Sequence, residues 1–238
     1  MKQTTKPRVK IYCISSIEEA KMAIIYGASA LGLVSAMPSG LGVISEELIA
    51  EIYAIVPPGV STFLLTSKQD VKSVIEQQRR CQVNTIQICD YLTLGKYQDL
   101  RDAMPGIALV QVIHVTGEES VKEAVEVSPL VDAILLDSGN KYLPIKQLGG
   151  TGKVHNWDLS KKIRELVDVP VYLAGGLNSE NVTAAIKQVS PFGLDICTGV
   201  RTNNKLDEMK LSQFFSQIYY SSFGVDEVQN LRTLGSRE

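Results

Sequence analysis

The sequence predicts an α/β fold, a single-domain TIM (β/α)8 barrel. Eight short and almost wholly apolar segments alternate along the chain with segments of helical periodicity, which is typical of a parallel sheet covered by helices. The length of 238 residues also suits one barrel of this kind. An open doubly wound sheet is the alternative, but it has no particular reason to stop at eight strand–helix units.

The elements can be placed by their periodicity and by the residues that begin and end helices. We expect strands at residues 9–14, 30–34, 60–65, 84–88, 107–113, 131–136, 170–173 and 193–197. We expect helices at residues 16–27, 45–56, 69–81, 94–104, 118–127, 158–167, 179–188 and 207–218. Ser16 and Glu19 have the spacing of a capping box. The barrel then covers residues 1–218, and residues 219–238 form a C-terminal tail.

Composition and charge exclude several classes of function. There are 24 Lys and Arg against 26 Asp and Glu, so the basic excess of a nucleic-acid-binding protein is missing. No uninterrupted apolar run is long enough to span a bilayer, and the four cysteines and two histidines lack the spacing of a zinc site. We expect a cytoplasmic protein, a monomer or homodimer, whose partner is a small molecule rather than a metal, a membrane or a nucleic acid.

Glycine clusters follow the last three expected strands, at residues 149–152, 175–176 and 198–199. Glycine lets backbone N–H groups approach an anion, and a helix starting near Asn178 or Ser179 would direct the positive end of its dipole to the same place. Each cluster alone could be a tight turn. Three neighbouring loops at the C-terminal face of a barrel instead predict a phosphate site.

One carboxylate, Asp137, ends the sixth expected strand after an apolar run. A carboxyl group at the apolar mouth of a barrel is partly desolvated, which raises its pKa and suits it to donate a proton near neutral pH. The alternative role for Asp137 is to cap the following loop by accepting a hydrogen bond from its backbone. Both roles place the carboxyl group at the mouth.

Several motifs together resemble phosphoribosylanthranilate isomerase of tryptophan biosynthesis. They are VKI at 9–11, GASALG at 27–32, ILLDS at 134–138, GGTGK at 149–153, Trp157, AGGLNSENV at 174–182 and PFGLDICTGV at 191–200. The resemblance covers residues 8–218 and is most specific in the second half. It implies a TIM barrel, in agreement with the strand count.

The resemblance also implies an Amadori rearrangement of a phosphorylated substrate, without metal or cofactor. A general acid protonates the furanose ring oxygen, the ring opens to a Schiff base, and a general base removes the proton from carbon 2 of the sugar. Asp137 falls on the family's general acid. The family's phosphate site falls on Gly150, Gly152, Gly175, Gly176, Thr198 and Gly199.

The resemblance fails at the general base. The family has Lys-Ile-Cys-Gly where this chain has KIYC at 10–13. Side chains alternate along a strand, so Cys13 would face the helix layer when Tyr12 faces the mouth, unless a bulge turns the strand. Cys13, and after it Cys89, are the candidate bases. We expect Tyr12, Cys89 and Arg201 in the substrate pocket.

Other departures lie in the same half. The family's Ser-Pro-Arg, whose Arg helps to hold the substrate, appears as SGL at 39–41, and its Gln-Leu-His-Gly appears as QICD at 87–90. Three hypotheses remain. The protein is an isomerase acting on phosphoribosylanthranilate, a divergent paralogue acting on another phosphosugar, or a non-catalytic barrel that binds a phosphorylated ligand.

Overall fold

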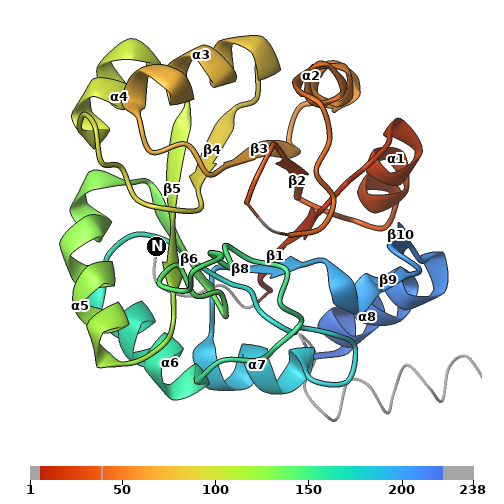
Figure 1. Cartoon of the computed structure of the whole chain (residues 1–238). Coiled ribbons are helices and arrows are strands. Elements are labelled where there is room, and N and C mark those ends of the chain that lie inside the picture. The colour runs from red at the N-terminus through yellow and green to blue at the C-terminus, as the bar shows by residue number, and fades with distance from the viewer. Residues whose placement is uncertain (1–5, 39, 222–238) are drawn as a thin grey trace, which may run out of the picture.

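A closed barrel confirms the predicted fold. This computed structural model describes residues 6–38 and 40–221, and in it eight parallel strands pair in chain order, with β8 against β1 (Figure 1). They are β1 (Arg8–Tyr12), β2 (Ala30–Val34), β3 (Ser61–Thr66), β4 (Thr85–Ile88), β5 (Ala108–His114), β6 (Ala133–Asp137), β7 (Val171–Leu173) and β8 (Gly193–Ile196). Each begins and ends within two residues of the strand expected from the sequence.

Helices surround the barrel (Figure 1). They are α1 (Ile17–Ile25), α2 (Glu46–Ile55), α3 (Val71–Cys81), α4 (Tyr97–Ala103), α5 (Glu118–Val127), α6 (Trp157–Leu166), α7 (Val182–Val189) and α8 (Glu208–Ser221). Shorter elements are the 3-10 turns η1 (Ser128–Leu130) and η2 (Thr198–Val200) and the paired strands β9 (Arg201–Thr202) and β10 (Lys205–Leu206). None of the described helices is long and apolar enough to cross a membrane.

Two apolar clusters form the core. The larger one lies between strands and helices and contains strand residues such as Ile11, Leu31 and Ile86. The smaller one fills the inside of the barrel, with residues such as Phe63 and Leu135. Because strand side chains alternate, strands such as β2 and β6 contribute to both clusters.

Three expected boundaries differ from the structure by three residues, and the first is the start of α4, which lies at Tyr97 rather than at residue 94. Helix α7 begins at Val182 rather than at residue 179, because Asn178 Oδ1 accepts hydrogen bonds from the N–H groups of Glu180 and Asn181 and forms a turn before the helix. The boundary placed after residue 218 falls inside α8, which continues to Ser221. Its last turn is packed, since Lys6 lies over the ring of Tyr219. Residues 222–238 of the expected tail lie outside the described residues.

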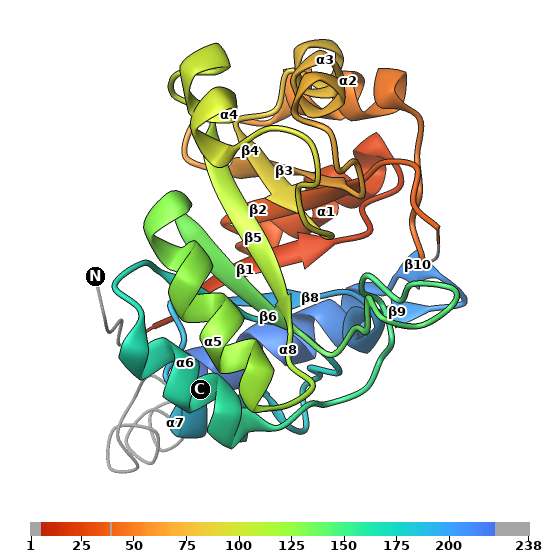
Figure 2. The ribbon, with the colours of Figure 1, turned by 60° about the vertical axis from the view of Figure 1, so that its left-hand side comes forward.

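The long segment between β6 and α6 lies beyond the C-terminal ends of the strands. Figure 2 shows it in green on the side toward which the strand arrows point, where β9 and β10 also lie. This end of a (β/α)8 barrel is where its enzymes carry their active sites. The fold therefore brings the glycine clusters and Asp137 to one face.

Candidate active site

A narrow cavity of about 20 Å³ lies at the C-terminal end of the barrel. Its ionisable lining residues, among the described ones, are Tyr12, Asp137 and Asp195. Leu41 and Leu148, from the loops after β2 and β6, line it as well. No group of three His, Cys, Asp or Glu side chains in the described part of the chain is placed to hold a metal ion. The cavity thus offers carboxyl and phenol groups in apolar surroundings.

Asp137 is the last residue of β6 and only 4% of it is exposed. The pKa of its carboxyl group is raised to about 6, chiefly by burial and to a lesser extent by the Asp195 carboxylate, while the N–H of Ser138 and the Lys10 ammonium oppose this rise. Its Oδ1 is buried and has no hydrogen-bond partner among the described residues. A carboxyl group that keeps its proton close to neutral pH and has an unbonded oxygen is suited to general acid catalysis.

Lys10 and Asp195 form a buried ion pair, which the motifs of the sequence do not predict. Their Cα atoms are partners in the register of β1 and β8, and Lys10 Nζ lies 3.0 Å from Asp195 Oδ2. The same Nζ donates a hydrogen bond of 2.6 Å to Gln87 Oε1 and lies 4.8 Å from the centroid of the Phe63 ring. The signal in the sequence was one charged residue inside each of two apolar strands.

Glycine on β2 makes room for this pair. A Cβ at Gly32 would lie 2.4 Å from Tyr12 Cβ and 3.1 Å from Lys10 Cε. Real Cβ contacts are not that short, so a larger residue at Gly32 would push Tyr12 and Lys10 out of place. The inside of the barrel is therefore shaped around these two side chains.

The three predicted glycine loops meet. A Cβ at Gly152, in the loop after β6, would lie 3.7 Å from Thr198 Oγ1 in the loop after β8. A Cβ at Gly199 would lie 2.0 Å from the carbonyl oxygen of Leu177 in the loop after β7. The loops are thus in contact through their backbones, and the residues expected to hold a phosphate are brought together.

Gly175 and Gly176 lie between the other two loops. Their φ angles of +83° and +63° are in the left-handed region that favours glycine. A Cβ at Gly176 would lie 2.7 Å from the carbonyl carbon of Lys153. The turn η2 begins at Thr198 beside them, in the place where barrels often hold a phosphate.

Tyr12 and Cys13 lie side by side at the end of β1 but have different surroundings. Tyr12 lines the cavity, and burial raises the pKa of its phenol, so it stays protonated. Cys13 has a φ of 61°, which ends β1 and breaks the alternation of side chains. Its thiol therefore packs inside the barrel rather than toward the helices.

The Cys13 thiol is covered by the loop after β2. Its Sγ donates a hydrogen bond of 3.2 Å to the carbonyl oxygen of Leu41, and Cys13 is not among the residues that line the cavity. A hydrogen bond with Cys197 and burial both raise the pKa of the Cys13 thiol. In this structure it is a protonated donor.

Arg201, expected in the substrate pocket, lies outside the cavity. Its guanidinium donates two hydrogen bonds of 2.9 Å to the carboxylate of Glu19 on α1. It also donates to the carbonyl oxygen of Cys13. A buried guanidinium needs such an anionic partner, and here the pair fixes the backbone of the left-handed residue after Tyr12.

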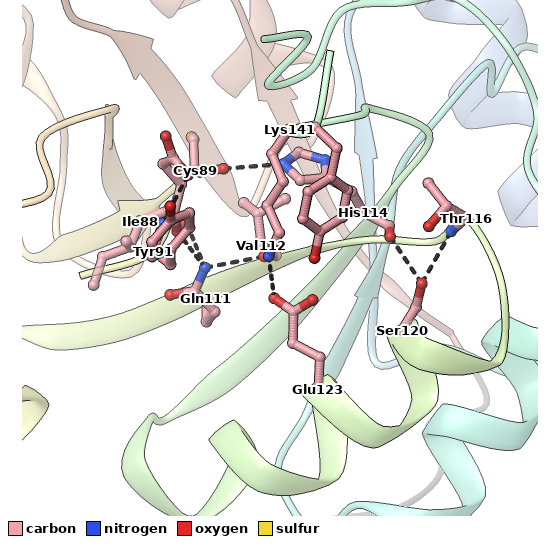
Figure 3. Close-up of polar contacts among 12 residues, drawn as sticks. Ile88, Cys89, Tyr91, Gln111, Val112, His114, Thr116, Ser120, Glu123 and Lys141 are labelled. Carbon is pink, nitrogen blue, oxygen red and sulfur yellow. Dashed lines mark hydrogen bonds and ion pairs between the residues drawn. The ribbon is translucent and has the colours of Figure 1, made fainter. Parts of the chain in front are cut away.

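Cys89 follows β4 and is also absent from the cavity lining. Burial raises the pKa of its thiol to about 12, and its carbonyl oxygen is 3.0 Å from His114 Nε2 (Figure 3). Gln111 Nε2 donates a hydrogen bond of 2.7 Å to the carbonyl oxygen of Asp90. Two side chains of β5, those of His114 and Gln111, therefore fix the backbone at the end of β4.

The segment between β6 and α6 contacts α5 and the residues that follow β4. Lys141 donates to Glu123 of α5, as Figure 3 shows, and Lys146 pairs with Asp90. Lys141 and Lys146 also lie over the ring of Tyr91. These contacts hold the segment that carries Leu148 and the first glycine loop to the cavity.

Comparison with known proteins agrees with this geometry. The family model described as N-(5'-phosphoribosyl)anthranilate (PRA) isomerase matches residues 9–217. The chain belongs to this family. A relative from Methanosarcina acetivorans, named N-(5'-phosphoribosyl)anthranilate isomerase, is 32% identical over 91% of this chain and 95% of its own length. The family inferred from the motifs is therefore confirmed.

Solved structures give the same result. One is a phosphoribosyl anthranilate isomerase in complex with reduced 1-(o-carboxyphenylamino)-1-deoxyribulose 5-phosphate, with a TM-score of 0.72 and 25% identity, covering 90% of this chain and 99% of that chain. Another is described as mutually generated monomers of the dimeric isomerase from Thermotoga maritima, with a TM-score of 0.73, 25% identity and the same coverage.

Proposed function

We propose that the protein isomerises N-(5'-phosphoribosyl)anthranilate to 1-(o-carboxyphenylamino)-1-deoxyribulose 5-phosphate, an Amadori rearrangement in tryptophan biosynthesis. One observation carries this proposal. Asp137 lines the same cavity as Gly149 and Gly150 of the first glycine loop, which supports a site that combines a proton donor with a phosphate-binding loop. Membership of the family supports the same reaction.

The substrate phosphate would bind the backbone of the loops after β6, β7 and β8, which places the furanose ring at the cavity. Asp137 protonates the ring oxygen, the bond from this oxygen to carbon 1 breaks, and the nitrogen forms a Schiff base with carbon 1. Removal of the proton on carbon 2 gives an enolamine, which becomes the ketose when carbon 1 takes up a proton. Substrate and product are isomers, so no oxidant or reductant is consumed.

The surroundings of Asp137 suit both halves of its cycle. Burial favours the neutral acid before proton transfer, and the nearby Lys10 ammonium favours the carboxylate that remains afterwards. A positioned general acid contributes about 10²–10⁴-fold to a rate. We expect Asp137 to make a contribution of this size to the rate.

We also propose that the protein works in the cytoplasm as a monomer or homodimer. All four cysteines lie in the described part of the chain, where they are buried and free, as suits a reducing compartment. A related isomerase from Thermotoga maritima is described as dimeric. Sedimentation of the purified protein distinguishes the two states.

Complementation tests the proposed function. We expect the protein to restore growth without tryptophan to a bacterial strain that lacks this isomerase, and the purified protein to convert phosphoribosylanthranilate to the ketose. The empty vector is the control. Failure of both growth and turnover would contradict the proposal. A set of other phosphosugars, screened by thermal shift, would then show whether the barrel serves a different ligand, because a ligand bound to the folded state raises its apparent stability.

A further inference from the structure

The reaction needs a general base in addition to Asp137, and the lining of the cavity limits the choice. Among the described residues, the other ionisable side chains that line it are Tyr12 and Asp195. Burial raises the pKa of Tyr12 well above its ordinary value, so the phenol is not a base. The thiols of Cys13 and Cys89 lie outside the lining, and burial adds to the rise in both of their pKa values.

The Asp195 carboxylate is built into the barrel as half of an ion pair. It is 3% exposed, and its Oδ2 lies 3.0 Å from Lys10 Nζ. Burial, the largest cause, raises the pKa of Asp195 above its ordinary value, and the ammonium beside it offsets part of this rise. An ammonium at this distance stabilises the carboxylate form that a base requires.

One carboxylate oxygen of Asp195 has no hydrogen-bond partner within the described fold. Its Oδ1 is buried without a hydrogen-bond partner among the described residues. Buried polar atoms are nearly always bonded, so a carboxylate oxygen without a partner, on a residue that lines a cavity, points to an acceptor for a ligand. Asp137 Oδ1 is in the same condition. Two carboxyl groups, one from β6 and one from β8, therefore each leave one oxygen free at one cavity.

We propose that Asp195, rather than a cysteine, is the general base that removes the proton from carbon 2 of the sugar. This proposal rests on the proposed function. Asp137 gives its proton to the ring oxygen, and Asp195 Oδ1 takes the proton from carbon 2. The electron pair of the broken C–H bond forms the carbon 1–carbon 2 double bond, and the Schiff-base nitrogen regains its electron pair. Asp195 then gives its proton to carbon 1 while Asp137 takes the proton of the carbon 2 hydroxyl, so both groups return to their starting states.

Lys10 is the positioning residue in this scheme. Its Nζ is fixed by Gln87 and by the ring of Phe63, and it holds Asp195 through Oδ2, which leaves Oδ1 for the substrate. Carboxylates serve as the bases for carbon-bound protons in other isomerases, and unlike surroundings let two carboxyl groups divide acid and base roles. The two carboxyl groups differ here in their geometry, because Lys10 Nζ lies 3.0 Å from Asp195 Oδ2 and Asp137 has no such ion pair among the described residues.

Steady-state kinetics on phosphoribosylanthranilate test the assignment. Asp195→Asn should lower kcat by about 10³-fold and change KM by less than about threefold, because a general base acts on the chemical step and the phosphate loops are untouched. The double variant Cys13→Ser/Cys89→Ser should keep at least about a tenth of kcat. Asp102→Asn is the matched control, since this exposed carboxylate on α4 accepts from Gln98.

Substrate deuterated at carbon 2 gives a second measurement. Asp195→Asn should show a larger isotope effect on kcat than the wild type, because proton removal becomes rate-limiting, whereas loss of a purely structural group would not change this ratio. Asp195→Glu keeps a charge beside Lys10 and should fold, with a kcat reduced by about 10–100-fold. Binding of the reduced ketose analogue by each variant reports an intact site.

The possible outcomes distinguish an error in the assignment of the base from an error in the proposed function. Wild-type turnover together with near-normal kcat in Asp195→Asn would overturn the assignment of Asp195 and leave the proposed function standing. The same holds if the double thiol variant loses about 10³-fold in kcat while Asp195→Glu does not. Absence of turnover by the wild type would overturn the proposed function and the assignment together.

Discussion

The two halves of the barrel mouth differ in whether backbone or side chains form their surface. The half formed by the loops after β6, β7 and β8 consists of backbone in close contact, where a Cβ at Gly199 would lie 2.0 Å from a carbonyl oxygen. The half formed by the ends of β1, β2 and β4 consists of side chains such as Tyr12 and Leu41. Backbone packing of the first kind leaves little freedom to change residues, whereas side chains of the second kind can be exchanged one at a time.

The end of β1 illustrates this difference within a few residues. Cys13 stands where the family has Gly, and it still takes a φ of 61°, the region that favours glycine. The Arg201 guanidinium donates a hydrogen bond to the Cys13 carbonyl oxygen and so holds this backbone conformation. A rebuilt half of the mouth is thus compatible with the same proton chemistry, provided that another group supplies the base.

The largest effect should come from the carboxyl group that the two halves share. Asp137→Asn removes the proton donor, so we expect kcat to fall by about 10³-fold or more while binding of the reduced ketose analogue persists. Asp132→Asn, just before the start of the same strand and paired with Arg101 on the surface, is the control and should change kcat less than about twofold. A kcat within tenfold of wild type for Asp137→Asn would rule out its role as the acid.

The phosphate half should respond through binding instead. Gly176→Val puts a side chain where a Cβ would lie 2.7 Å from Lys153 and 2.8 Å from Val154, so the loops after β6 and β7 must separate. We expect KM to rise by about 10²-fold with a smaller change in kcat, since lost ground-state binding appears in KM.

Gly106→Val is the matched control for this substitution. Gly106 has a φ of +87° and nothing within 4 Å of its Cβ position, so it tests strain without contact. If Gly176→Val and Gly106→Val give the same KM, the loops do not hold the phosphate.

Much of the fold could be predicted from the sequence, and so could the contact between the three glycine loops. Strand and helix periodicity is a local property, so all eight units were found with small errors at their ends. The glycine loops were also predictable, because a parallel barrel brings the ends of its last strands together whatever their register. The start of α7 was missed because Asn178 forms a turn of its own before the helix.

The rest depends on how distant segments meet. Lys10 and Asp195 face each other only when β1 closes on β8, and a single sequence does not reveal that register. The left-handed turn at Cys13 is a property of the backbone that its side chain does not signal. Arg201 was expected in the pocket, yet its partner Glu19 lies 182 positions away in the sequence.

The dependence of kcat/KM on pH tests the central claim, that two carboxyl groups at the mouth carry both proton transfers. Asp137 must be protonated to act, and burial places its pKa at about 6, so kcat/KM should fall by about tenfold for each pH unit above this value. Asp195 must be ionised, so activity should also fall at lower pH. We predict for the wild-type protein a maximum on the acidic side of neutrality. Activity that instead keeps rising above pH 8, as a thiolate base would require, would contradict the account.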